Sequence, residues 1–212
     1  MKYAIYIVLL AFFGYLLLKI TLQYIPIRDT AAFLQIKQQY IPIKHWKFAF
    51  FTHVFTSMFV LIAGFTQFST VFLQKYRKAH RFLGYIYVID ILLITGPASF
   101  VMALYANGGL SSRTAFTILA ISWWFTTFKA LQAARNKDFI SHKNWMYRSY
   151  ALTLSAVTLR AWKYLIIKIA TIYAVSLPPM DVYRAVAWLG FVPNLLVAEW
   201  LFVIHSKEKA RK

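Results

Sequence analysis

Six long stretches of the chain contain few charged residues, and each approaches the length that a helix needs to cross a lipid bilayer. A helix requires about 20 predominantly apolar residues to span a hydrocarbon core of about 30 Å. The sequence therefore predicts an all-α integral membrane protein, with residues 1–212 forming a single transmembrane domain built as a bundle of six transmembrane helices. The predicted spans lie near residues 3–20, 48–72, 83–105, 114–134, 145–175 and 184–206.

Composition supports a membrane protein and excludes several classes of site. Apolar residues make up 60% of the chain and charged residues 14%, against roughly 45–50% and 25% in soluble domains. A soluble protein of this size could not bury that excess, because much of a small domain remains at its surface. Cysteine is absent, which excludes disulfides, thiolate metal sites, iron–sulfur clusters and a cysteine nucleophile. Histidine, with five copies, is the remaining soft metal ligand.

The basic residues predict the orientation of the chain in the membrane. The formal net charge is +18, and short cytoplasmic loops are enriched in Lys and Arg. Their clustering in the loops after spans two and four and in the tail places both termini in the cytoplasm, and it removes the need for a nucleic-acid partner. The loop of residues 21–47 has four basic residues of its own, which oppose this orientation. The three basic clusters contain Lys75, Arg77, Lys78 and Arg81, then Arg135, Lys137, Lys143 and Arg148, and finally Lys207, Lys209, Arg211 and Lys212.

Polar side chains inside the predicted spans are the first candidates for function, because ionisable groups are costly at membrane depth and usually face the bundle interior. At 100° per residue, His53 and Gln67 fall on one face of span two together with Gly64. Thr153 and Arg160 share a face of span five in the same way. We expect the two faces to line a common interior, while ordinary helix packing remains the alternative for the small residues.

Two acidic residues lie within the predicted spans. Asp90 has two interpretations, a counter-ion to a cation on a neighbouring helix or a protonated carboxyl that donates to a backbone carbonyl. Glu199 is a second candidate counter-ion on span six. Arg160 lies too deep to reach water easily. We therefore expect it to have an acceptor inside the bundle, and the candidates are either carboxylate, a backbone carbonyl and a bound anionic group.

His80 and His142 are the main candidates for binding a cofactor. His80 opens span three and His142 precedes span five, both on the predicted cytoplasmic side and among basic and aromatic residues. Two neutral imidazoles from facing helices are the usual axial ligands of a b-type haem, and Gly84, one turn after His80, would leave room for the ring. Arg81 and Arg148 would pair with the haem propionates. A metal or proton role for His80, His142 and His53, or a structural role at the interface, remains open, and no catalytic residue is predicted.

The order and spacing of these motifs resemble the bacterial membrane-protein family of domain of unknown function 2306. The family resemblance implies a multi-pass protein of the bacterial cytoplasmic (inner) membrane. The histidines at helix starts are also similar to those of cytochrome b561 and of small multi-histidine membrane proteins implicated in maturing haem–copper oxidases. Span four has no histidine, so at most one bis-histidine haem b is supported. The resemblance covers about residues 48–165 and is carried by His53, Gly64, Gln67, Phe68, Arg77, His80, Arg81, Gly84, Tyr85, His142, Trp145, Met146, Arg148, Tyr150 and Arg160.

Two functions compete, both within the lipid bilayer. The first is an electron carrier with one haem b, which exchanges electrons with a quinone or a respiratory partner; no flavin or nucleotide motif suggests a complete enzyme. The second is a non-catalytic accessory subunit that assists the assembly of a larger respiratory or export complex and handles metal or haem through its histidines. A transporter that uses His53, Asp90 and Arg160 is a third interpretation, which no inverted repeat supports.

Overall fold

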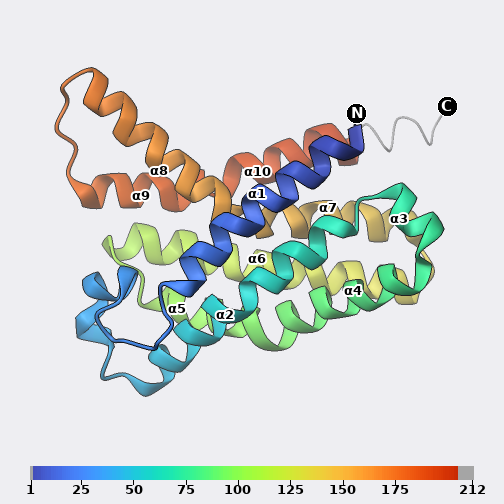
Figure 1. The fold of residues 1–212 in the computed structure, drawn as a ribbon, viewed down its shortest axis with the longest axis horizontal. Coiled ribbons are helices and arrows are strands. Elements are labelled where there is room, and N and C mark those ends of the chain that lie inside the picture. The colour runs from blue at the N-terminus through green and yellow to red at the C-terminus, as the bar shows by residue number, and fades with distance from the viewer. Residues whose placement is uncertain (1, 205–212) are drawn as a thin grey trace. The chain divides into compact units, whose positions relative to one another are not determined.

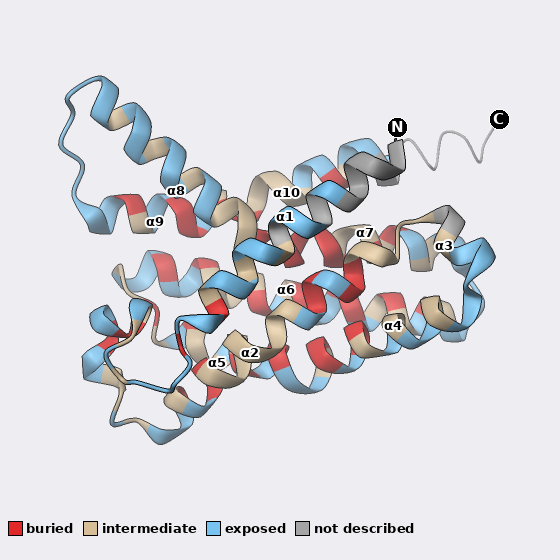
Figure 2. Cartoon of the chain, in the orientation of Figure 1, coloured by how far each residue is buried: buried red, intermediate tan, exposed pale blue. Residues whose placement is uncertain are grey.

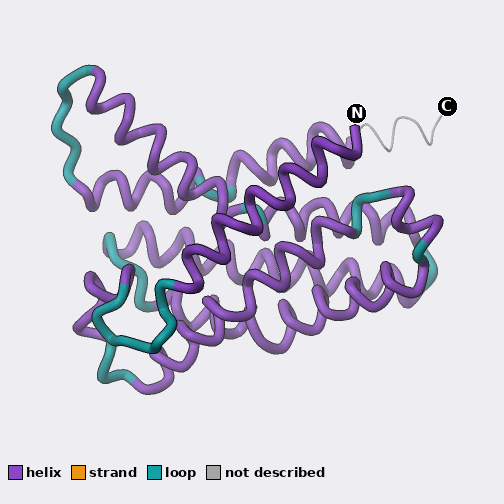
Figure 3. Tube along the Cα trace, viewed as in Figure 1, coloured by secondary structure: helices purple, strands orange, loops and turns teal. Residues whose placement is uncertain are grey.

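A computed structural model describes residues 2–204, and every regular element within that range is helical (Figures 1 and 3). This confirms the predicted all-α fold class for the described part of the chain. His205 and the basic residues of the tail, Lys207, Lys209, Arg211 and Lys212, lie outside the described residues. The chain divides into two compact units, residues 1–102 and residues 103–212.

The first unit is organised around one central helix, α2 (Lys44–Thr66), which packs against α1 (Lys2–Leu22) and against the later helices of the unit. The connection after α1 contains the 3₁₀-helix η1 (Ala32–Tyr40). Its Leu34 is fully buried, and Trp46 and Phe50 of α2 stack with their ring centroids 5.6 Å apart. The long first loop of the sequence is therefore a packed segment rather than an open connection.

The rest of the first unit is a short helix followed by a long helical run. The short helix is α3 (Thr70–Lys75), and the run consists of α4 (Arg77–Ile89), the π-helix η2 (Asp90–Thr95) and α5 (Gly96–Leu104). The N–H of Gly96 bonds to the carbonyl of Ile91, five residues earlier. Pro97 has no N–H to give to the carbonyl four residues before it, and a π segment accommodates such a gap in the hydrogen-bond ladder.

Two helices in the described residues are long and apolar enough to cross a membrane, Lys44–Thr66 and Arg77–Leu104. They overlap the second and third predicted spans, although the second predicted span, 48–72, extends past the end of α2 into α3. The predicted total of six spans and the cytoplasmic position of both termini stay predictions.

The second unit is built on α6 (Gly109–Arg135), which packs along α7 (Phe139–Thr153). Small buried residues such as Ala130 let the two helices approach closely, as is common between membrane helices. Side-chain hydrogen bonds cross this contact, among them one from Trp123 Nε1 to Thr153 Oγ1 at 2.9 Å and one between the hydroxyls of Thr127 and Ser149 at 2.7 Å. Figure 2 marks the buried positions along both helices.

The two remaining predicted spans are not single helices in the structure. Residues 145–175 are divided at Leu154 between α7 and α8 (Ser155–Ile172), and residues 184–206 are divided among α9 (Pro179–Leu189), α10 (Val192–Ala198) and the π-helix η3 (Glu199–Ile204). The Thr158 hydroxyl lies within hydrogen-bond distance of the carbonyls of Leu154 and Gly190 and can give its one proton to either. Hydroxyl contacts with the preceding turn of this kind bend helices. Pro193 lacks the N–H that a continuous helix would need.

Candidate functional site

A chain of hydrogen-bonded oxygen atoms joins α2 to the π-helix of the first unit. Thr95, the last residue of η2, is fully buried, and Asp90, its first residue, is 6% exposed. The Thr95 hydroxyl lies within hydrogen-bond distance of Asp90 Oδ1 and 2.5 Å from the hydroxyl of Thr56. The Thr56 hydroxyl in turn donates to the carbonyl of Thr52 at 2.8 Å. The carboxyl group of Asp90 is thus held by hydroxyl groups within a candidate membrane span.

His53 is joined to the same segment through a second hydroxyl. Its Nδ1 lies 2.8 Å from Ser99 Oγ, and Ser99 Oγ donates to the carbonyl of Thr95 at 2.7 Å. A serine hydroxyl has one proton, so the proton shared with His53 must come from the imidazole. In the tautomer that satisfies both contacts, Nδ1 of His53 carries the proton.

Sequence reasoning found His53 and Asp90 but missed the three hydroxyls that join them to one network. Thr56, Thr95 and Ser99 were not singled out because serine and threonine are common at helix contacts. A usable signal existed, since Pro97 lies between Thr95 and Ser99 and follows Asp90 by two helical turns. A proline in that position predicts a fault in the helix beside an ionisable residue.

His142 is held in a defined orientation in the second unit. Its Nδ1 lies 2.8 Å from the carbonyl oxygen of Ala130 on α6. Because a carbonyl can only accept, Nδ1 carries the proton and Nε2 is the nitrogen able to bind a metal. His142 is half-buried and lies in the first turn of α7.

The start of α7 is fixed by Asp138, which caps the helix before His142. The backbone N–H of Ser141 donates to Asp138 Oδ1 at 3.0 Å, and the carbonyl of Asp138 accepts from the N–H of His142 at 2.9 Å. Hydrogen bonds from the Ser141 side chain and backbone hold the pKa of the Asp138 carboxyl below its usual value. The cap therefore fixes where the helix begins, and so which face presents His142.

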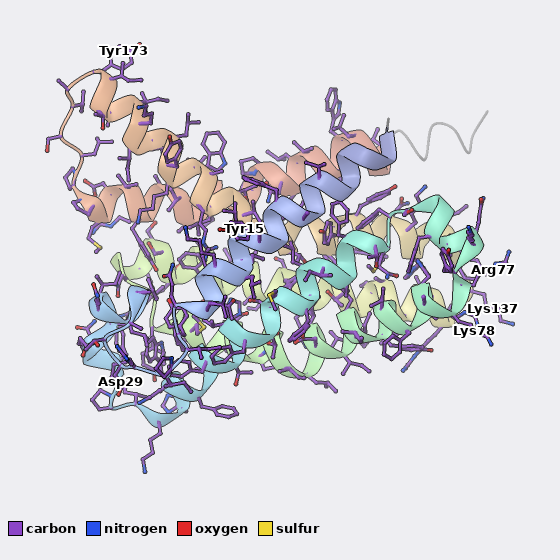
Figure 4. The ribbon with its side chains drawn as sticks, viewed as in Figure 1. Tyr15, Asp29, Arg77, Lys78, Lys137 and Tyr173 are labelled. Atoms are coloured by element: carbon purple, nitrogen blue, oxygen red, sulfur yellow. The ribbon has the colours of Figure 1, made fainter. Side chains whose placement is uncertain are left out.

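The other predicted cofactor residues of the first unit lie on α4. His80 and Gly84 are half-buried, and Arg81 is exposed, as are Arg77 and Lys78 at the start of the helix (Figure 4). The space expected beside Gly84 is taken, because a Cβ atom there would lie 3.1 Å from Gln67 Oε1. The Gln67 amide also donates to its own helix. In this structure, therefore, Gln67 rather than an open slot borders Gly84.

Arg148 makes contacts that the sequence did not predict. Its guanidinium forms two hydrogen bonds of 2.8 Å to the carboxylate of Glu199 and lies 4.6 Å from the centroid of the Trp145 ring. This geometry is bidentate, the strongest arrangement for an arginine–carboxylate pair. Glu199 is therefore a counter-ion, as one hypothesis allowed, but its partner is Arg148. The proposed bond from Arg148 to a propionate would have to displace this pair.

Arg160 and the predicted interior face of span five are arranged differently from expectation. Ser149 and Thr153 are buried on α7, whereas Arg160 on α8 is exposed and donates to the carbonyl of Ala156 on its own helix. The prediction of a shared face assumed one continuous helix. The break at Leu154 removes that assumption, because residues on either side of it no longer follow one helical rotation.

The structure leaves the pairing of His80 with His142 as a prediction, because the two residues belong to different units. Within residues 2–204, no group of three or more His, Cys, Asp or Glu side chains is placed to hold a metal ion. The predicted metal roles of His53, His80 and His142 stay predictions as well.

Comparison with known proteins identifies the family. The model of a predicted membrane protein family, DUF2306, matches residues 50–202, which is more than half of the chain. The chain belongs to this family, and its association with the lipid bilayer follows from that membership. No curated protein and no solved structure matches the sequence.

Proposed function

We propose that this member of the DUF2306 family is a multi-pass protein of the bacterial inner membrane that binds one b-type haem and carries electrons to or from a quinone or a respiratory partner. The observation that supports it best is the 2.8 Å contact between His142 Nδ1 and the carbonyl of Ala130. Metal-bound histidines almost always use their second ring nitrogen in this way.

The contact serves a haem ligand in two respects. It selects the tautomer with its lone pair on Nε2, so the ring needs no rearrangement before it binds iron. It also fixes the plane of the ring, because Ala130 lies on a helix that packs along α7 and is itself fully buried. A carbonyl hydrogen bond to Nδ1 makes the imidazole a better donor to the metal.

The second haem ligand and the partners of the haem propionates are proposed from the sequence. His80 is the proposed second ligand, and Arg81 and Lys143 are exposed cations that could meet propionates. Arg148 is a weaker partner than the sequence suggested, because Glu199 already holds it. A bound haem would supply a reversible one-electron couple, and the role of these side chains is to hold and orient it.

The experiment is the absorption spectrum of the full-length protein purified in detergent from cells supplied with haem. We expect a Soret band and reduced-minus-oxidised bands in the wild type, their loss in His142→Leu and His80→Leu, and their retention in the control His45→Gln, an exposed histidine at the start of α2. A colourless wild type would overturn the proposal and favour the accessory-subunit hypothesis. Full haem content in His142→Leu would equally overturn it.

The role of the His142 ring nitrogen as a ligand has a separate test. Replacing Ala130 cannot remove a backbone carbonyl, but His142→Gln retains a polar side chain without an aromatic nitrogen. We expect His142→Gln to lose haem as fully as His142→Leu does while folding like the wild type. Equal haem in His142→Gln and wild type would show that the ring nitrogen is not a ligand.

A further inference from the structure

We propose that the N-terminus of α6 binds a phosphate group, carried by an anionic phospholipid or present as free phosphate. The donors are the backbone N–H groups in the first turn of α6, the hydroxyl of Ser112, and the guanidinium groups of Arg113 and Arg184. All of these residues belong to the second unit. The inference does not depend on haem.

The first turn of α6 has no side-chain cap. The initial N–H groups of an α-helix have no carbonyl partner within the helix, and the N-cap residue, Gly108, has no side chain to accept from them. Gly109 follows with a φ of +75°, and no atom of a more distant described residue lies within 4 Å of the position that its Cβ would take. This end of a 27-residue helix is therefore open to a ligand, and such an end attracts anions through its N–H groups and its dipole.

Ser112 gives a second, independent indication of a missing acceptor. Its side chain is fully buried, and its Oγ has no hydrogen-bond partner among the residues that the structure describes. Side chains of a helix tilt toward its N-terminus, and Ser112 Oγ lies 2.5 Å from the position that a Cβ atom at Gly108 would take. The hydroxyl is thus directed at the uncapped helix end. A buried hydroxyl without a partner is costly, and an oxygen of a bound phosphate would accept its proton.

Two arginine side chains are held beside the same helix end. Arg113 Nε donates to the carbonyl of Ala106 at 3.4 Å, and Arg184 Nε donates to the carbonyl of Gly108 at 3.0 Å. Both carbonyls belong to the loop that leads into α6, so both guanidinium groups lie next to its first turn. An arginine has five N–H donors, and these contacts leave further donors on each side chain for the oxygens of a phosphate.

The charges around the helix end are positive on balance. The helix α6 contains no acidic residue, and α9 contains one, Asp181. Its Oδ1 accepts from Arg184 Nη1 at 2.8 Å, and the two residues are three positions apart on α9. Two arginines against one aspartate leave one positive charge, to which the helix dipole adds about half a charge. The site therefore favours an anion.

The side chain of Arg184 controls access to the Ser112 hydroxyl. Its Cγ lies 3.2 Å from the same Cβ position at Gly108, so its aliphatic part helps to cover the hydroxyl. The side chain is 49% exposed and can move aside. Binding of a phosphate would draw the guanidinium toward the helix end and uncover the hydroxyl in the same movement.

The arrangement and the position of the site fit a phosphate. Its donors come from a helix end, a hydroxyl and two guanidinium groups, and a phosphate has several acceptor oxygens that can meet donors from several directions. The helix α6 begins just before the fourth predicted span, so on that prediction its N-terminus lies near the headgroups of the bilayer. Trp188 lies beside it, with Nε1 donating to Ser111 Oγ at 3.2 Å, and tryptophan is typical of the headgroup level in membrane proteins.

The experiment is calorimetric titration of the purified full-length protein in a maltoside detergent, which contains no phosphate, at constant ionic strength. One arm adds inorganic phosphate and the other adds short-chain phosphatidylglycerol, and the arm that gives saturable binding identifies the source of the phosphate. We expect Ser112→Ala and Arg184→Gln each to weaken binding about ten-fold, because each removes a hydrogen bond to a charged group. The control Arg135→Gln, at the opposite end of the same helix, should bind like the wild type. Absence of binding in both arms, or equal binding by Ser112→Ala and the wild type, would overturn the proposal.

Chemical unfolding of the same proteins separates a binding role of Ser112 from a structural one. Without ligand, Ser112→Ala should be at least as stable as the wild type, because it removes a buried hydroxyl that has no partner. Addition of the ligand that binds should stabilise the wild type and leave Ser112→Ala nearly unchanged. A ligand-free Ser112→Ala that is less stable than the wild type would show that the hydroxyl has a partner within the folded protein, and would overturn the proposal.

Discussion

The pair between Arg148 and Glu199 gives a quantitative test of how α7 is held to the end of the second unit. Two hydrogen bonds of 2.8 Å join the guanidinium to the carboxylate. The side chain of Arg148 is 20% exposed and that of Glu199 is 43% exposed. In its exposure to solvent, the pair is therefore intermediate between a buried ion pair and a surface ion pair.

The expected coupling energy follows from these two limits. Hydrogen bonds to charged groups contribute about 1.5–3 kcal/mol when they are buried, and exposed ion pairs contribute about 0.2–1 kcal/mol. A half-exposed bidentate pair should give about 1 kcal/mol of coupling, which is about a five-fold change in the unfolding equilibrium constant.

The assay is a double-mutant cycle on reversible unfolding of the purified protein in mixed micelles, with Arg148→Met, Glu199→Gln and the double variant. The exposed pair Asp181–Arg184, three residues apart on one helix, is the control, and its coupling should stay below about 0.5 kcal/mol. A coupling for Arg148 and Glu199 below about 0.3 kcal/mol, the usual error of additivity, would refute the energetic argument.

The same variants separate a structural from a cofactor role for Arg148. If the role of Arg148 is to pair with Glu199, Arg148→Met and Glu199→Gln should change haem content equally. A loss of haem in Arg148→Met alone would show that the guanidinium binds a propionate after all.

Three further predictions concern the cap of α7, the glycine of α4 and the topology. The pKa of Asp138 is lowered in the folded protein, so its contribution to stability is present above its unfolded pKa of about 3.9 and is lost as the pH falls through the folded value. Unfolding measured against pH should therefore show the wild type losing its advantage over Asp138→Ala in acid, and an advantage that survives in acid would contradict the cap. Gly84→Ala should stabilise the protein by up to about 1 kcal/mol through helix propensity. The gain should be larger in a Gln67→Ala background than in the wild type, because the new Cβ would lie 3.1 Å from Gln67 Oε1. Equal gains in the free energy of chemical unfolding in the two backgrounds would refute the contact. Reporter fusions after Lys78 should report cytoplasm and those after Gly109 the opposite side, and a cytoplasmic signal at Gly109 would end the orientation model.

The fold class was predictable because it depends on composition and on the spacing of charges. The second and third predicted spans lie close to two helices that are long and apolar enough to cross a membrane, Lys44–Thr66 and Arg77–Leu104, since each is a long apolar run. The breaks at Leu154 and at Gly190–Phe191 were harder to predict. The break at Leu154 depends on the contact of the Thr158 hydroxyl with the Gly190 carbonyl, which is a tertiary contact. Pro193, in contrast, is a sequence signal for the break at Gly190–Phe191.

For the candidate site, too, the sequence identified residue types that could function but not the partners that they have in the structure. The sequence singled out His142 because histidine is rare and is placed at a helix start, but Ala130 could not be foreseen, since any backbone carbonyl can accept. The sequence also left Asp90 with two interpretations. The hydroxyl contacts that Asp90 makes in the structure were not foreseen, because threonine is common as a residue type at helix contacts.

The choice of counter-ion shows why a helical face cannot be extended across a break. On one continuous helix, Arg160 would share a face with Thr153 and would be directed toward the same neighbours. The turn at Leu154 ends that rotation, so α8 carries Arg160 to an exposed position where it bonds to its own helix. Arg148, on the buried side of the break, is then the cation that reaches Glu199. The sequence identified Glu199 as a candidate counter-ion, but the break at Leu154 determines that Arg148 rather than Arg160 is its partner.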